Sequence, residues 1–380
     1  MSPYSHQGNN SIKYMTMKTF VRQAVLSAMG LSAMALAGCS KASLDTPVAP
    51  VGERVEITLG AEVASTAKVK AGLSRGVVDK GSAGPLFVSF ARIDQDETSG
   101  KYPADYSDVD SAFVASWKGT LASADGSATA IKFYDPKFYL SRASNNGTKL
   151  VGWYPQTAFK SGSNGVIEIA VNGSNDIMLT EELEGSKDKR FGTYVSDGDA
   201  GNRIFHFSHQ LTQLRFFAYG VDAAAPGVWG KIKSIKLKEQ LPTCEITLPD
   251  EVVFTGTAAH LALVKKKASG DANIDYGTDG LEFSFDSSVA ADGDEQANRE
   301  KSATECGYAM VAPIAAGGKL TLIIETEKGG ERDDIAVSLP ADGFKAGYAY
   351  NIYLRFSAIT IEPKAAISKW QTGGNVNIEM

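Results

Sequence analysis

The chain has few cysteine and histidine residues and no excess of positive charge. Only 3 Cys and 4 His occur among 380 residues, so neither a disulfide framework nor a zinc site with several Cys and His ligands is predicted. Asp and Glu number 44 against 38 Lys and Arg, which gives a net charge of −6. Without a basic surface, binding to nucleic acid is not expected. The fold must therefore depend on a hydrophobic core.

The sequence also lacks the motifs of common enzymes and ligand sites. It contains no Gly-x-Ser-x-Gly elbow, phosphate-binding loop or dinucleotide fingerprint, and its acidic loops do not match the calcium-binding pattern. His206 and His209 lie three residues apart in a strand-like run, so their side chains should point to opposite faces. His209 shares the phase of Phe205 and Phe207, which predicts that it faces the core. We expect no enzymatic activity, no metal ion and no cofactor.

The beginning of the sequence has the form of a lipoprotein export signal. A basic start at Met17 leads into the apolar stretch 24–37, which is too short to span a bilayer. It ends in Leu-Ala-Gly before Cys39, the arrangement that precedes a lipid-carrying cysteine. Residues 17–38 are therefore predicted to be a removable signal peptide, and Cys39 is predicted to carry the lipid. Residues 1–16 do not resemble a signal, so we expect the true start at Met17 or Met15.

The rest of the chain has the period of β-strands. In its first run the apolar residues alternate with polar ones or glycine, as in a strand with one buried face; they are Val55, Ile57, Leu59, Ala61 and Val63. Similar runs follow, separated by turn dipeptides such as Asn146-Gly147. No helical period is sustained, and residues 174–190 are the best candidate for a helical turn. The pattern predicts an all-β fold of antiparallel sheets.

The length after the leader is typical of two domains. The polar, charged stretch 181–202 predicts a boundary near Asn202, which separates an N-terminal domain, residues 76–202, from a C-terminal domain, residues 203–370. Residues 39–75 form a segment with the first strand, and residues 371–380 form a separate tail. The sequence leaves open whether Cys244 and Cys306 form a disulfide.

Several motifs occur in an order that resembles one known family. After the Leu-Ala-Gly-Cys motif come Ser74-Arg75-Gly76, Gly152-Trp153-Tyr154-Pro155, the run from Phe205 to Phe216, Phe344 to Tyr350, and Ile367 to Trp370. Each motif alone is degenerate, but their order resembles the fimbrillin family of the Bacteroidales, whose members are subunits of type V pili. The resemblance covers nearly all of the chain after the leader.

That resemblance implies a fold, a location and a way of assembly. It implies two Greek-key β-sandwich domains of transthyretin-like topology, export as a lipoprotein to the outer membrane and cell surface, and cleavage by an outer-membrane protease after an arginine. Cleavage between Arg75 and Gly76 would release the first strand, and a strand of a neighbouring subunit would then enter the groove. Arg54 is a competing site, but a cut there would leave the first strand in place.

The C-terminal tail is the candidate donor of that strand. After Gly373-Gly374, the apolar residues Val376, Ile378 and Met380 alternate with polar ones. The alternative is that the tail pairs within its own domain as an edge strand. Asp110-Ser111-Ala112 also fits a short acceptor pattern for O-glycosylation at Ser111 in these bacteria.

Two functions remain from the sequence. The first is a structural pilin that supports adhesion and has other pilin subunits as partners. The second is a surface lipoprotein that acts as a tip adhesin or as a module that binds a glycan or another ligand on a host or bacterial surface. The sequence does not distinguish a stalk, tip or anchor subunit, and it identifies neither the ligand nor the protease.

Overall fold

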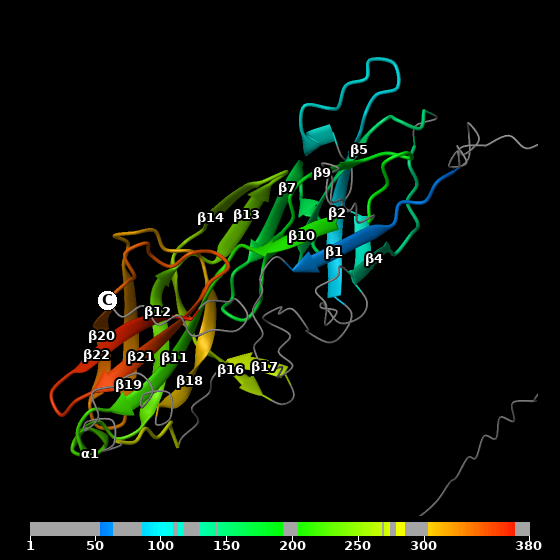
Figure 1. Ribbon diagram of the computed structural model, residues 1–380. Helices are drawn as coiled ribbons and strands as arrows, with labels where there is room; N and C mark the ends of the chain where they lie inside the picture. Colours follow the sequence, from blue (N-terminus) through cyan, green and yellow to red (C-terminus); the bar gives the residue numbers. More distant parts are fainter. Residues whose placement is uncertain are drawn as a thin grey trace, which may run out of the picture. The chain divides into compact units, whose positions relative to one another are not determined.

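The computed structural model describes residues 54–63, 86–108, 113–117, 129–140, 143–192, 204–267, 270–273, 279–285 and 303–368. These residues form β-strands almost throughout (Figure 1). The exceptions in the described ranges are one short α-helix, α1 (Ala225–Trp229), and one 3-10 turn, η1 (Tyr106–Asp108). The all-β prediction is confirmed.

The first sheet has eight strands in the order β2-β3-β4-β1-β10-β8-β5-β9. Its strands are β1 (Leu59–Val63), β2 (Leu86–Asp94), β3 (Phe113–Trp117), β4 (Thr129–Phe133), β5 (Thr148–Tyr154), β8 (Met178–Leu179), β9 (Leu183–Gly185) and β10 (Ile204–His209). β2 also pairs with β5, so the strand pairing closes on itself. In this order β1 lies between β4 and β10.

Three further sheets contain the other strands. A six-stranded sheet, in the order β17-β16-β18-β11-β21-β22, consists of β11 (Thr212–Gly220), β16 (Val264–Lys267), β17 (Gly270–Asn273), β18 (Thr304–Val311), β21 (Ala349–Phe356) and β22 (Ile361–Ser368). The sheet β15-β12-β19-β20 consists of β12 (Ile232–Gln240), β15 (Ala259–Ala262), β19 (Leu320–Thr326) and β20 (Gly330–Val337). The sheet β14-β13-β7-β6 consists of β6 (Phe159–Lys160), β7 (Ser163–Ala170), β13 (Thr243–Thr247) and β14 (Glu251–Thr255).

Two of these sheets pack face to face over a shared core. Leu214 and Phe216 of β11 and Ile352 of β21 lie in one buried cluster with Leu237 of β12 and Leu322 of β19. Such packing of two twisted sheets through their inner side chains is a β-sandwich. The cluster excludes water from the alternate residues of both sheets, which is the main source of stability for this part of the chain.

Two strand pairs run parallel within the otherwise antiparallel arrangement. They are β1 with β10 and β11 with β21. Antiparallel neighbours can be joined by a short hairpin, whereas parallel neighbours require a long connection. Each parallel pair joins strands more than 100 residues apart in the sequence, so a prediction from neighbouring runs and turns could not identify it.

The predicted domain boundary at Asn202 lies outside the described residues. Around it, β10 belongs to the sheet of β1, and the next strand, β11, belongs to the six-stranded sheet. The sheet β14-β13-β7-β6 combines β7, which precedes the boundary, with β13 and β14, which follow it. Strands from both sides of Asn202 therefore share one sheet, and the domain limits remain a prediction.

The helical turn expected within residues 174–190 is wrong. This stretch contains β8 and β9 joined by irregular backbone. The helix α1 lies elsewhere, with Pro226 in its first turn, where a missing N–H costs nothing. It ends at Gly230, whose φ of 67° favours glycine.

Candidate functional site

The candidate site is the place that residues 55–63 fill between β4 and β10, which we call the β1 slot. Along this strand the exposed fractions are 8% for Val55, 3% for Ile57, 3% for Leu59 and 0% for Ala61. The intervening Glu56 and Thr58 are exposed. From Val55 to Leu59 the burial alternates as the sequence predicts, and Gly60, which has no side chain, is buried as well.

Backbone hydrogen bonds hold this segment on both sides. On one side Leu59 to Ala61 pair antiparallel with β4, and on the other Gly60 to Val63 pair parallel with β10 (Figure 1, blue strand). Before β1, the N–H of Ile57 donates to the carbonyl of Lys137 at 2.7 Å, and the N–H of Tyr139 donates to the carbonyl of Val55 at 3.0 Å. The segment is therefore a central strand of its sheet.

The inner side of the slot is an aromatic core. The β1 residues pack in one buried cluster with Phe90, Phe133, Tyr139, Phe191, Phe205 and Phe207. Phe90 makes edge contacts with Phe205 and Phe207, at centroid distances of 5.2 and 6.1 Å. Full burial of an aliphatic side chain such as Ile57 or Leu59 is worth about 1.5 to 3 kcal/mol. A slot without its strand would expose this core to water.

The chain after β9 passes directly over the backbone of β1. A Cβ at Gly192 would lie 3.1 Å from the nitrogen of Gly60 and 3.1 Å from the carbonyl oxygen of Thr58, and Gly192 has a φ of 76°. Only glycine fits both the close approach and the left-handed backbone. Beside it the N–H of Phe191 donates to the Tyr139 hydroxyl at 3.1 Å. β1 is therefore held by the aromatic core on one face and by the backbone at Gly192 on the other.

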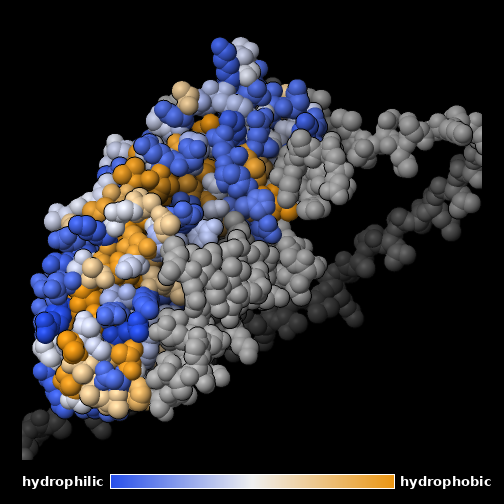
Figure 2. Space-filling model, turned by 60° about the vertical axis from the view of Figure 1, so that its left-hand side comes forward, coloured by the Kyte–Doolittle hydropathy of each residue, from blue (hydrophilic) through white to orange (hydrophobic). Residues whose placement is uncertain are grey.

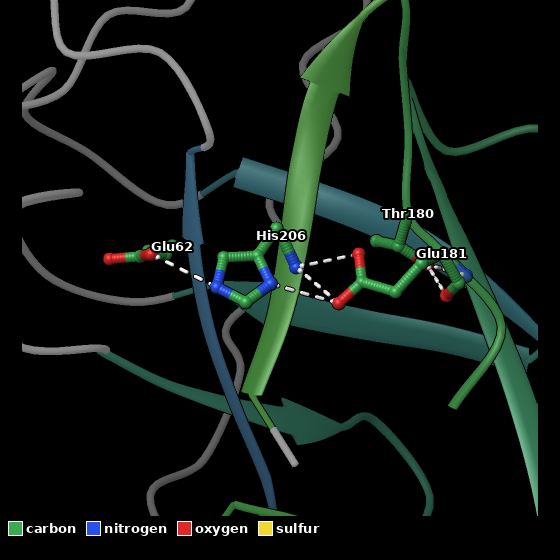
Figure 3. Close-up of polar contacts among 5 residues, drawn as sticks. Glu62, Thr180, Glu181 and His206 are labelled. Carbon is green, nitrogen blue, oxygen red and sulfur yellow. Dashed lines mark hydrogen bonds and ion pairs between the residues drawn. The ribbon is translucent and has the colours of Figure 1, made fainter. Parts of the chain in front are cut away.

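The outer side of the slot carries a chain of polar contacts (Figure 3). Nε2 of His206, on β10, lies 3.1 Å from Oε1 of Glu62 on β1. Nδ1 of the same ring lies 2.9 Å from Oε1 of Glu181, which follows β8. Glu181 also accepts the backbone N–H of His206, at 3.2 and 3.3 Å. His206 therefore lies between two carboxylates, one on β1 and one outside it.

His209 lies on the opposite face, as predicted. Its side chain is 1% exposed, and its Nδ1 lies 2.8 Å from Oδ2 of Asp176, whose side chain is 0% exposed. The N–H of Ile177 donates to the other carboxylate oxygen at 2.9 Å. Burial, and after it the nearby charge of Asp176, raises the pKa of Tyr154 to about 12. The buried contact between His209 and Asp176 ties the end of β10 to the residues before β8.

The structure places only some of the predicted site residues. Val55, Ile57 and Leu59 fill the slot with buried side chains, and Val63 ends β1 opposite Phe207. The other predicted residues lie outside the described ranges: Cys39 for the lipid, Arg75 and Gly76 for cleavage, Ser111 for the glycan, and Val376, Ile378 and Met380 for the donor strand. The sequence did not identify Glu62 and Glu181 as partners of His206. The one signal in the sequence was the position of His206 on the polar side of a strand.

The two cysteines do not form a disulfide. Cys244 and Cys306 are both fully buried, and they belong to different hydrophobic clusters. Burial raises the pKa of the Cys244 thiol to about 12. Because the thiolate is the reactive form, both thiols are shielded by burial, and Cys244 by its protonation as well.

We predict that neither thiol reacts with a disulfide reagent at pH 8 while the protein is folded. The measurement is absorbance after addition of the reagent to the Cys39→Ser chain, in which only Cys244 and Cys306 remain. Both should react when urea unfolds the chain. Labelling of either residue in the native protein would contradict the burial of its thiol.

The described residues offer no metal site and no membrane helix. They contain no group of three or more His, Cys, Asp or Glu side chains placed to hold a metal ion. None of the helices in this part of the chain is long and apolar enough to cross a membrane. On the face drawn in Figure 2, several hydrophobic patches lie among hydrophilic residues.

Comparison with known proteins finds similarity at the level of solved structures. No protein-family model and no curated protein matches the chain. A "putative cell adhesion protein" of Bacteroides uniformis covers 84% of this chain and 99% of its own, with 17% identity and a TM-score of 0.49. A second, of Bacteroides ovatus, covers 85% and 100%, with 13% identity and a TM-score of 0.48. The tip fimbrial protein Mfa3 of Porphyromonas gingivalis, with a C-terminal truncation, covers 84% and 100%, with 9% identity and a TM-score of 0.41. These neighbours are named as fimbrial or "putative cell adhesion" proteins of Bacteroidales species.

Proposed function

We propose that this chain is a structural subunit of a cell-surface fimbria and that it polymerises by exchanging β1 for a strand of a neighbouring copy. The proposal rests on the central place of β1. Its buried residues cover an aromatic core, and both of its backbone edges are paired. A strand in this position leaves an unfilled groove when it is removed, whereas an edge strand does not.

The connectivity makes β1 removable. β1 precedes all the other described strands, and its neighbours β4 and β10 come later in the chain. One cut between Val63 and Leu86 separates residues 54–63 from the rest without interrupting any other connection. Arg75 lies in this interval, within the small-residue sequence Ser-Arg-Gly. Cleavage there is the simplest event that would open the slot.

An open slot is a strong template for another strand. It would present the unpaired backbone groups of β4 and β10 together with the apolar side chains that β1 now covers. Unpaired edges of this kind accept strands from other chains, with hydrogen bonds supplying affinity and side-chain pockets supplying specificity. The tail 371–380, with alternating Val376, Ile378 and Met380, supplies the matching period. Assembly then needs no enzymatic activity of the subunit itself.

The other steps follow from the sequence. The leader directs export, Cys39 carries the lipid that holds the precursor at the outer membrane, and an arginine-specific protease cuts after Arg75. The cut removes the lipid together with β1, so maturation and activation of the slot are one event. The partners are other pilin subunits, and the location is the fimbria at the cell surface.

Analysis of sheared fibres tests this function directly. Antibody to the chain should label fibres along their length in electron microscopy, and N-terminal sequencing should begin at Gly76, which leaves 305 residues. A first residue at Cys39 or within residues 39–63 would contradict loss of β1. Labelling confined to fibre tips would favour the alternative, a tip adhesin.

We predict that Arg75→Ala blocks maturation. The precursor should reach the surface with its lipid and β1 in place, and no fibre should form, because its own strand fills the slot. Mass spectrometry of surface material measures the retained segment. Arg54→Ala is the matched control, because Arg54 precedes β1 in the sequence. Its guanidinium carbon lies 4.3 Å from the ring centroid of Phe138. This control should leave maturation unchanged; fibres from Arg75→Ala cells would contradict the assignment.

A further inference from the structure

The polar contacts on the outer side of the slot distinguish the strand from the body that holds it. Glu62 belongs to β1, whereas His206 and Glu181 belong to the body and remain after a cut at Arg75. Glu181 binds both Nδ1 and the backbone N–H of His206. This double contact fixes the ring so that Nε2 points at the strand in the slot (Figure 3).

An imidazole held in this way recognises a negative group. Both ring nitrogens here face carboxylate oxygens, at 2.9 and 3.1 Å, and a ring N–H is a donor that a carboxylate accepts. When β1 leaves, the contact to Nε2 is lost while the contact to Nδ1 remains. The vacated slot then has a position that favours a carboxylate in the strand that enters it.

Resting on the proposed function, we propose that His206, oriented by Glu181, is a specificity-determining residue that selects a donor strand with a carboxylate at the position of Glu62. In a neighbouring copy of this chain that carboxylate is Glu379. The tail then runs in the direction of β1, with Met380, Ile378 and Val376 at the positions of Val63, Ala61 and Leu59.

The contact with His206 distinguishes donor registers that the burial of apolar residues does not distinguish. A shift of the donor by one residue places polar side chains in the core, so burial excludes it. A shift by two residues keeps the period and is not excluded by burial. Glu379 is the single acidic side chain in residues 375–380, so the contact with His206 distinguishes registers two residues apart. A shift by two would place Asn377 opposite the ring.

Three variants distinguish the contact that His206 makes in the precursor from the contact that it makes in the fibre. Glu62→Gln should affect the precursor alone, because the residue is lost on cleavage, and β1 amides should exchange hydrogen faster. Glu379→Gln should affect the fibre alone, with extension slowed about three-fold, the size expected for a partly exposed contact between a carboxylate and an imidazole. His206→Gln should produce both effects. Glu56→Gln, on the same strand and exposed, is the control and should leave both measurements unchanged.

The decisive measurement is the rate of fibre extension by chains cleaved at Arg75, followed by light scattering. Glu379→Gln should slow extension in chains with His206 and should have no further effect in chains with His206→Gln. Glu181→Gln offers a second route to the same loss if His206→Gln fails to fold. Equal slowing in both backgrounds, or none in either, would overturn the role of His206 alone. Failure of the unaltered cleaved chain to extend would overturn the proposed function itself.

Discussion

Deletion of Gln371 to Met380 is expected to leave a folded, correctly cleaved subunit that does not extend a fibre. The expected loss is complete, because the tail is the proposed occupant of the slot in the next subunit. Each apolar side chain that enters the slot is worth about 1.5 to 3 kcal/mol at full burial, before the cost of ordering the tail. Electron microscopy measures fibre length, and thermal unfolding should show an almost unchanged monomer.

A single substitution should have the same effect. Ile378→Asp places a carboxylate among the aromatic side chains of the slot, which costs several kcal/mol without a partner. Asn377→Asp is the matched control, since it introduces the same group one residue away, on the opposite face of the strand. This variant should still assemble. Long fibres from Ile378→Asp, or collapse of the monomer fold on deletion of the tail, would indicate that the tail is an internal strand.

The burial of the first strand could be predicted because it depends on a local pattern. Val55, Ile57, Leu59 and Ala61 recur with a period of two, and this period is a property of any strand with one buried face. The neighbours of the strand could not be predicted in this way. Parallel pairing of β1 with β10 depends on how distant segments pack, and no turn between them records it.

The run from Phe205 to Phe216 divides between two sheets, and a change of phase in the sequence marks the division. From Phe205 to Leu211 the buried residues are at odd positions, and from Thr212 to Ala218 they are at even positions, as in Leu214 and Phe216. This change of phase marks the passage from β10 to β11. A single strand cannot bury both phases on one face, so the run had to divide.

The polar part of the site could not be predicted for a statistical reason. Asp and Glu contribute 44 residues, and Glu62, Glu181 and His206 come from three separate parts of the chain. Nothing in the sequence selects two of these carboxylates as partners of one imidazole. The contacts arise because β10 lies next to β1 on one side and next to β8 on the other.

Replacement of His209 with alanine is expected to lower the free energy of unfolding by about 3 to 5 kcal/mol, because it removes the imidazole from a buried carboxylate. The side chains of His209 and Asp176 are 1% and 0% exposed, so the carboxylate would lose the imidazole and gain no water. Urea unfolding measures the change.

His206→Ala is the matched control for this effect. It is the same substitution on the same strand, but its side chain is 35% exposed and its carboxylate partners are open to water. The expected cost is about 0 to 1 kcal/mol, as for other exposed ion pairs. Replacement of His209 and Asp176 together by leucine should cost less than His209→Ala, because no charge is then left in the core. If His209→Ala costs no more than His206→Ala, water reaches Asp176 and the pair does not hold β10 to the residues before β8.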